Sequence, residues 1–234
     1  MDERINARLL PARRDGGFRL PGKYVWCSSV VFADGKWHAF SSAWPEREDP
    51  DDHDDVQVLQ NYWTLSTIVR AEADDPEGPY TLCETVLEGQ GGDHWSYECC
   101  HNPCLVRIGD TWILYFQTKG QDRNDRHIGY ATSTSVYGPW VLADDALPLG
   151  YNVTNPSVWP EPDGRVRMAF RTEGMKIAIA EAAAYDGPYE IVNHDICPGV
   201  KLEDPFRYHL NGRYHMLLED NAGQVTGDLR HGVH

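Results

Sequence analysis

The residues with the clearest chemical potential lie in the stretch ECCHNPCLVRIGDTWILYF. It begins at Glu98 and then brings together Cys99, Cys100, His101 and Cys104. Thiolate and imidazole groups are zinc ligands, so a metal site is the first hypothesis to test. The paired Cys-x-x-Cys spacing of a structural zinc site is missing. We therefore expect no metal here and assign the thiols to core positions.

A recurring frame supports this assignment, because a structural unit repeats whereas a metal site is expected once. The frame is an Asn-Pro or Asp-Pro step, a short apolar strand, a turn ending in glycine and a second strand. It recurs in VTNPSVWPEPDGRVRMAFR from Val153 and in LEDPFRYHLNGRYHMLLED from Leu202, while WCSSVVFADGKWHAFSS from Trp26 lacks the proline. Asp-Gly or Asn-Gly pairs in these turns are strong hairpin signals. The turn glycines are Gly35, Gly109, Gly164 and Gly212.

A second half-motif follows each of the first three copies. It holds an alternating strand, a polar loop and a Gly-Pro-aromatic step, at Gly78-Pro79-Tyr80, Gly138-Pro139-Trp140 and Gly187-Pro188-Tyr189. The unit is therefore four short strands, repeated roughly every fifty residues. Such units are the antiparallel blades of a β-propeller. We predict an all-β, single-domain β-propeller over residues 1–234, with blades near 25–88, 98–148, 152–198 and 201–234.

The first interval is longer than the others because of the acidic segment PEREDPDDHDDVQVLQNYW, residues 45–63. We interpret it as a loop insertion. Its carboxylates suit a divalent cation such as calcium, but an acidic run is more often only a solvated loop. We expect the protein to require no cofactor.

The residues that open each first half-motif are expected to meet. In a propeller the first strand of each blade lines the central channel, so these residues should converge on one funnel. They are Trp26 and Cys27, His101 and Asn102, Thr154 and Asn155, and Glu203 and Asp204.

Blades that open with an acidic or amide residue before proline, followed by Asp-Gly hairpins and Gly-Pro-aromatic turns, resemble the five-bladed glycoside hydrolases of families 43, 62 and 117. The resemblance covers nearly the whole chain from Val25 onward. It implies a five-bladed propeller, of which the chain supplies about three and a half to four blades. It also implies hydrolysis of a glycosidic bond in an oligo- or polysaccharide.

The resemblance further assigns roles to individual positions. In family 43 an aspartate that opens the first blade is the general base, an aspartate that opens a middle blade tunes the acid, and a glutamate in a Glu-Gly-Pro step is the general acid. The matching positions here hold Cys27, Asn155 and Glu203. Glu203 is therefore the expected acid, and the other two positions lack a carboxylate.

Glycoside hydrolysis needs a protonated carboxylic acid and a carboxylate that flank the scissile bond. Asp204 follows Glu203 directly, and adjacent strand residues point to opposite faces, so we expect the two not to pair easily. Glu98 lies just ahead of an inner strand and is one candidate for the second group. His101 is another, because imidazole titrates near neutral pH and family 117 enzymes use a histidine as acid. A hydrogen-bonded packing role for His101 is equally compatible with the sequence.

Sugars bind to aromatic faces and to planar hydrogen-bonding groups. Arg171 closes the second strand of the third blade, where it either reaches a substrate hydroxyl or carboxylate or forms an ion pair between blades. The predicted substrate-binding residues are Trp26, Trp44, Trp95, Asn102, Asn155 and Arg171.

Composition excludes several other classes. The formal net charge of −15 argues against partners such as nucleic acid or an anionic membrane. No segment approaches the roughly eighteen apolar residues of a membrane helix, and the first residues do not resemble a secretory signal, so we expect a cytoplasmic protein. The 6 cysteines in 234 residues do not suggest a disulfide framework, and we expect mostly reduced, buried thiols.

The fourth copy stops within its third strand, and no fifth copy follows. The segment GGFRLPGKYVW is a candidate to add a strand to a late blade. We favour a truncated five-bladed ring whose open edges cause self-association, with strands from a partner chain or a closed four-bladed ring as alternatives. The alternative function is a non-catalytic carbohydrate-binding propeller.

Overall fold

The computed structural model describes residues 11, 13–46, 63–120, 125–220, 222–225, 227 and 232–233. Most of the acidic segment 45–63 lies outside these residues, so the calcium hypothesis for it is not addressed. No helix within the described residues is long and apolar enough to span a membrane.

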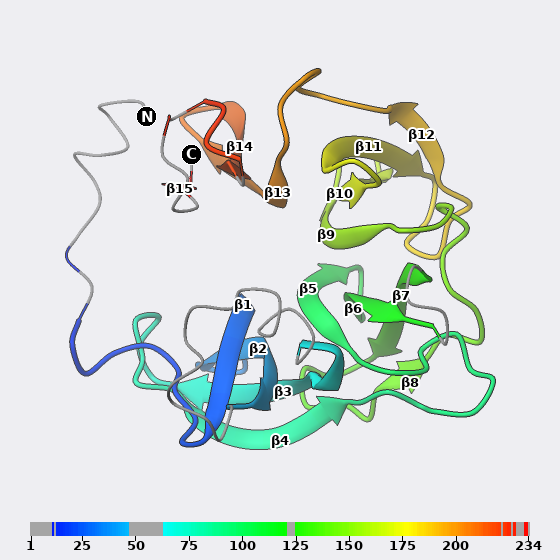
Figure 1. Cartoon of the computed structure of the whole chain (residues 1–234). Coiled ribbons are helices and arrows are strands. Elements are labelled where there is room, and N and C mark those ends of the chain that lie inside the picture. Colours follow the sequence, from blue (N-terminus) through cyan, green and yellow to red (C-terminus); the bar gives the residue numbers. More distant parts are fainter. Residues whose placement is uncertain are drawn as a thin grey trace.

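Four antiparallel sheets stand around a common centre, with the first strand of each innermost (Figure 1). We call them blades 1 to 4. Blade 1 comprises β1 (Lys23–Ala33), β2 (Lys36–Pro45), β3 (Thr67–Ala73) and β4 (Thr81–Leu87), with the 3-10 helix η1 (Trp63–Leu65) between β2 and β3. Blade 2 comprises β5 (His101–Ile108), β6 (Thr111–Lys119), β7 (Arg126–Ser133) and β8 (Val141–Leu142). Blade 3 comprises β9 (Thr154–Pro160), β10 (Val166–Thr172), β11 (Lys176–Ala182) and β12 (Glu190–Asn193), and blade 4 comprises β13 (Glu203–Leu210), β14 (Arg213–Asp220) and β15 (Gly232–Val233).

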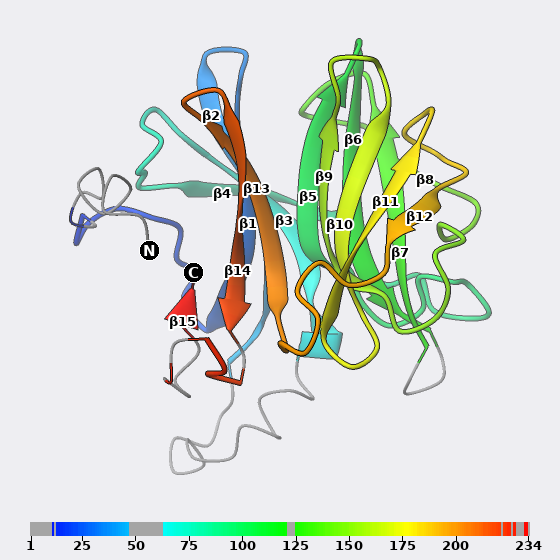
Figure 2. The ribbon, with the colours of Figure 1, turned by 90° about the horizontal axis from the view of Figure 1, so that it is seen from above.

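Strand order within each sheet follows the chain, as in propeller blades. The predicted all-β fold with four-stranded antiparallel blades is confirmed, with three full blades and one of three strands. Figure 2 shows the strands of the blades running in roughly one direction, with η1 at the end of the molecule where β13 begins.

The hairpin turns form where the glycines predict them. Asp34 and Gly35 between β1 and β2 have φ values of 48° and 80°, and Asn211 and Gly212 between β13 and β14 have 53° and 74°. Two successive left-handed residues define the tight hairpin turn that Asp-Gly and Asn-Gly favour. These turns fix the register of the first two strands in their blades.

Each inner blade buries both of its faces, because alternate residues of a strand point to opposite sides. In β6, Ile113 and Tyr115 pack with Phe170 of blade 3, whereas Leu114 and Phe116 pack toward blade 1. All five side chains are fully buried. Truncating one of the aromatic residues to alanine would typically cost about 3–5 kcal/mol.

One hydrogen bond recurs at each seam between inner strands. The backbone N–H groups of Leu105, Val158 and Arg207 donate to Ser29 Oγ at 2.9 Å, Cys104 Sγ at 3.2 Å and Ser157 Oγ at 3.4 Å, respectively. The three acceptors occupy equivalent positions in successive blades. Cys104 is therefore a structural acceptor, and burial raises the pKa of its thiol to about 11.

The expected packing of the other thiols holds in part. Cys99 and Cys100 are buried, and the pKa of Cys100 is raised by burial to about 12. All six cysteines are free thiols, but Cys83 is exposed rather than buried.

Residues 16–26 contact or belong to blade 1 and not a late blade, so the additional strand predicted for this segment is wrong. Gly17 N–H donates to Glu77 O at 2.7 Å, and Tyr80 N–H donates to Gly17 O at 2.9 Å. Phe18 packs against small residues of blade 1, including Ala39. These small residues leave room for Phe18 on the face of blade 1 that is turned away from blade 2.

The sides of blades 1 and 4 that lack a neighbouring blade remain exposed in part. Val30 is 43% exposed, whereas its equivalents Leu105 and Val158, which pack against a preceding blade, are 5% and 6% exposed. Phe206, equivalent to the seam acceptors Ser29 and Cys104, is 60% exposed. The described blades therefore form an open arc.

Candidate active site

A β-bulge occurs at the same place in the first strand of all four blades. The residue within each bulge has a positive φ, between 44° and 54°, which asparagine and aspartate tolerate better than most residues. Such bulges re-aim side chains next to functional sites. The bulged residues are Cys27, Asn102, Asn155 and Asp204.

Each bulge is flanked by a cross-strand pair that completes the rim of the funnel. The residue before the bulge pairs with a residue of the second strand, and this second residue is also equivalent in all blades. The pairs are Trp26 with Ser42, His101 with Gln117, Thr154 with Arg171, and Glu203 with Glu219. The residues predicted to open each blade therefore share one local geometry, a bulged hairpin that is repeated in all four blades.

Hydrogen bonds link the rim from one blade to the next. Asn102 N–H donates to Ser42 Oγ at 2.8 Å, and Asn155 N–H donates to Gln117 Oε1 at 2.8 Å. The side-chain amide of Asn155 donates in turn to the carboxylate of Asp204. The two asparagines are thus positioning residues of the rim, each held through its backbone by the preceding blade.

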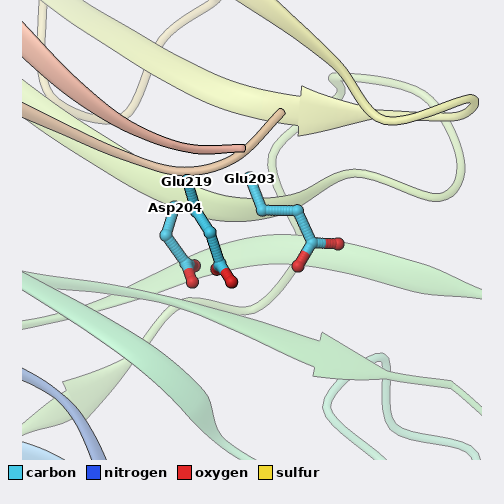
Figure 3. A group of neighbouring side chains, drawn as sticks. All are labelled: Glu203, Asp204 and Glu219. Atoms are coloured by element: carbon cyan, nitrogen blue, oxygen red, sulfur yellow. The ribbon is translucent and has the colours of Figure 1, made fainter. Parts of the chain in front are cut away.

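The acidic end of the rim lies on blade 4. One carboxylate oxygen from each of Glu203, Asp204 and Glu219 lies within 4.8 Å of the other two (Figure 3). The prediction that Glu203 and Asp204 point to opposite faces is wrong, because the bulge at Asp204 breaks the alternation of the strand. Glu219 was missed by the sequence analysis, although the register set by the Asn211-Gly212 turn places it opposite Glu203.

Two neighbouring side chains contact this acidic cluster. Arg171 of blade 3 forms an ion pair with Glu203, which is the inter-blade alternative considered for this arginine. Asn155 donates to Asp204. Carboxylate oxygens are also the ligands that calcium prefers. Arg171 supplies one positive charge beside the three carboxylates.

Cys27 occupies the rim position that the family resemblance assigns to the general base. Burial and the negative charges of Asp204, Glu219 and Glu203 raise the pKa of its thiol well above the usual value. The thiol is therefore neutral near pH 7 and does not replace a carboxylate base.

His101 is 6% exposed and lies between two tryptophans. Its ring centroid is 5.4 Å from that of Trp44 and 5.2 Å from that of Trp63, and its Nδ1 is hydrogen bonded to Ser66 Oγ at 2.9 Å. Burial lowers the pKa of His101 to about 3. A neutral imidazole carries no proton to deliver as a general acid near pH 7, so the geometry corresponds to the hydrogen-bonded packing role.

Glu98 is not part of the acidic cluster. Its carboxylate forms an ion pair with Lys119, and its backbone N–H donates to the carbonyl of the same lysine at 3.0 Å. The structure therefore ties Glu98 to the second strand of blade 2.

The three tryptophans predicted as sugar platforms differ in their surroundings. Trp26 is 53% exposed at the rim and presents a free surface. Trp44 is 9% exposed, because Tyr24 and His101 contact its ring. Trp95 stacks on Phe116 and its indole N–H donates to the Ala143 carbonyl at 3.1 Å. Trp95 is therefore a packing residue of blade 2, which corrects its assignment as a platform.

Comparison with known structures agrees with this architecture. A family 117 glycoside hydrolase, Zg3597 of Zobellia galactanivorans, superposes with a TM-score of 0.60 and 14% identity, covering 91% of this chain and 69% of that one. A thermostable family 43 glycoside hydrolase superposes with a TM-score of 0.60 and 13% sequence identity. The match covers 85% of this chain and 64% of that one. The β-1,2-mannobiose phosphorylase of Listeria innocua superposes with a TM-score of 0.61 and 15% sequence identity. The match covers 86% of this chain and 70% of that one.

The chain is thus similar in fold to five-bladed propeller glycoside hydrolases and spans 64 to 70% of the length of these three proteins. No protein-family model matches the chain, and no curated protein matches its sequence.

Proposed function

We propose that the protein is a glycosidase whose general acid is Glu203. The main support for this proposal is the cluster of Glu203, Asp204 and Glu219 at the funnel rim. One carboxylate oxygen of each residue lies within 4.8 Å of the other two. A carboxyl group that holds a proton beside an ionised carboxylate is the basic requirement of glycoside hydrolysis.

Asp204 is the proposed ionised partner. It accepts a hydrogen bond from the amide of Asn155, which fixes the direction of its carboxylate. The short separation from Glu203 resembles the spacing of about 5–5.5 Å in retaining glycosidases more than the about 6.5–9.5 Å of inverting ones. We therefore propose a retaining outcome, in which Asp204 attacks the anomeric carbon while Glu203 protonates the leaving oxygen.

Arg171 controls the availability of Glu203 in this proposal. Its ion pair with Glu203 favours the ionised carboxylate in the free protein. A substrate that engages the guanidinium of Arg171 would weaken this ion pair and thereby favour the protonated carboxyl group of Glu203. Substrate binding would thereby prepare the acid.

The test is hydrolysis of a panel of aryl glycosides over a range of pH. Glu203→Gln keeps the shape of the side chain but cannot deliver a proton, so the rate should fall by at least about a hundredfold. Glu181→Gln is a matched control, because Glu181 also pairs with an arginine, Arg167, on blade 3. Unchanged turnover in Glu203→Gln would remove Glu203 from the mechanism.

A carbohydrate-binding role without catalysis is the second candidate, and one observation favours it. The rim positions of blades 1 to 3 hold no carboxylate, and the base position holds the neutral Cys27. Binding of oligosaccharides by a wild-type protein that hydrolyses none of the panel would support this candidate and reject the glycosidase.

A further inference from the structure

Arg126, the first residue of β7, is a cation that has no ion-pair partner among the described residues. Its guanidinium carbon lies 5.4 Å from the ring centroid of Trp63, and the side chain is partly buried. Within the described part of the chain, its guanidinium forms no ion pair and no hydrogen bond, and its Nε is buried without a partner. Buried charges are usually paired, so this arginine is unusual.

Arg126 lies beside the funnel rim. Its carbonyl accepts a hydrogen bond from Val153 N–H at 3.3 Å, and the next residue, Thr154, pairs across the strand with Arg171. Trp63, against which Arg126 stacks, also contacts the rim residue His101. The guanidinium is therefore close to the seam between blades 2 and 3.

Further polar atoms near this seam lack partners. Thr154 is 1% exposed and its Oγ1 makes no hydrogen bond with the described residues, and the same holds for the Nε of Arg171. These groups can all donate hydrogen bonds. Several hydrogen-bond donors without an acceptor among the described residues therefore lie near the seam between blades 2 and 3.

Arg126 also lacks a carboxylate partner of its own within the described residues. Burial and the nearby positive charge of Arg171 lower the pKa of Arg126, and Glu203 is the carboxylate that opposes this shift. Glu203 is already in an ion pair with Arg171. Among the described residues, no carboxylate is therefore in direct contact with the Arg126 guanidinium.

We propose that Arg126 and Arg171 together bind an anionic group on the sugar, a carboxylate or a sulfate ester. The guanidinium of Arg126 lies over the ring of Trp63, and its Nε has no hydrogen-bond partner among the described residues. Arginine forms bidentate hydrogen bonds to such anions. The ligand anion supplies the missing negative partner. This inference rests on the proposed carbohydrate function and names an acidic or sulfated glycan as its ligand class.

Binding measurements test this proposal separately from catalysis. Titration calorimetry with the full chain would compare glucuronate and glucose 6-sulfate with glucose. We expect at least one of the two anionic sugars to bind about tenfold or more tightly than glucose, because a charge-assisted hydrogen bond contributes that much. Arg126→Gln should abolish the preference for the anionic sugar over glucose. Arg107→Gln is the matched control, because the Arg107 guanidinium also lies over a tryptophan ring, that of Trp112, but Arg107 is near the end of β5, next to the β5–β6 turn.

Several outcomes separate the two proposals. Equal binding of charged and neutral sugars, or a preference that survives Arg126→Gln, would overturn the anion site even if hydrolysis were observed. Inorganic sulfate that binds through Arg126 while neither anionic sugar binds would also overturn it, because the anion would then not be carried by a sugar. An Arg126-dependent preference in a protein that hydrolyses no glycoside would uphold the site and reject the glycosidase.

Discussion

The side-chain amide of Asn155 donates a hydrogen bond to the carboxylate of Asp204, its structural equivalent in the next blade. Both residues occupy a β-bulge with a positive φ. One repeated backbone feature thus places a donor and an acceptor against each other across a seam. The contact fixes the direction of Asp204 and joins blade 3 to the acidic cluster.

Asn155→Asp should destabilise the protein and reduce activity. Aspartate tolerates the left-handed backbone, but it replaces the amide donor by a second carboxylate that faces Asp204. We expect the free energy of unfolding to fall by about 1–3 kcal/mol near neutral pH. Denaturant unfolding measures this change. Asn152→Asp is the control, since Asn152 also has a positive φ, 56°, in a loop; equal stability of the two variants would contradict the prediction.

Cys104→Ser and Cys104→Ala should differ. Serine keeps an acceptor for Val158 N–H and is the residue found at the equivalent positions 29 and 157. Alanine leaves this buried N–H unsatisfied, which costs about 1–3 kcal/mol. We expect the serine variant to unfold close to the wild-type denaturant midpoint and the alanine variant well below it. The opposite order would show that the thiol acts through its volume alone.

His101 should contribute to acid sensitivity. Because burial lowers its folded-state pKa to about 3 from an ordinary value near 6.5, the unfolded chain binds the additional proton between these pH values. The contribution of neutral His101 to the free energy of unfolding is therefore fully present above about pH 6.5. It is lost as the pH falls toward 3, by at most about 1.4 kcal/mol per pH unit. His101→Gln should destabilise the protein at pH 7, and this penalty should shrink at pH 4.5. A penalty independent of pH, measured by denaturant unfolding, would exclude the titration of His101.

Self-association should occur through the exposed sides of blades 1 and 4. Val30 and Phe206 occupy positions that contact a neighbouring blade elsewhere in the repeat, yet they are 43% and 60% exposed. Light scattering should detect oligomers, and combining Val30→Asp with Phe206→Asp should reduce them. Val141→Asp is the control, because Val141 is 66% exposed but lies on the outer strand β8. A monomeric wild-type chain would refute this expectation.

The repeat could be predicted from the sequence because its signals are local. Turn pairs such as Asp34-Gly35 dictate the hairpins, and the spacing of the motifs dictates the number of sheets. The expectation that Glu203 and Asp204 point to opposite faces was wrong, because strict alternation of side chains applies only to regular strands. No single residue type predicts the one-residue bulge that interrupts it. The contact between Arg126 and Trp63 could not be predicted from the sequence, because it depends on how blade 1 and blade 2 pack. Glu219 could have been found by counting across the hairpin from Glu203.

The seam bonds between inner strands have a consequence for cooperativity. In the described part of the chain, the main strand contacts between blades join sequence neighbours, so the array approximates a linear chain of units with nearest-neighbour coupling. Blades 2 and 3 are coupled on both sides, whereas blade 4 has one such seam and its β14 is largely only half-buried. Native-state hydrogen exchange should therefore show a gradient, with the amides of β6 and β10 opening at the highest free energy and those of β13 and β14 opening first. Because the acidic cluster lies on blade 4, its geometry would follow the local opening of this least protected unit.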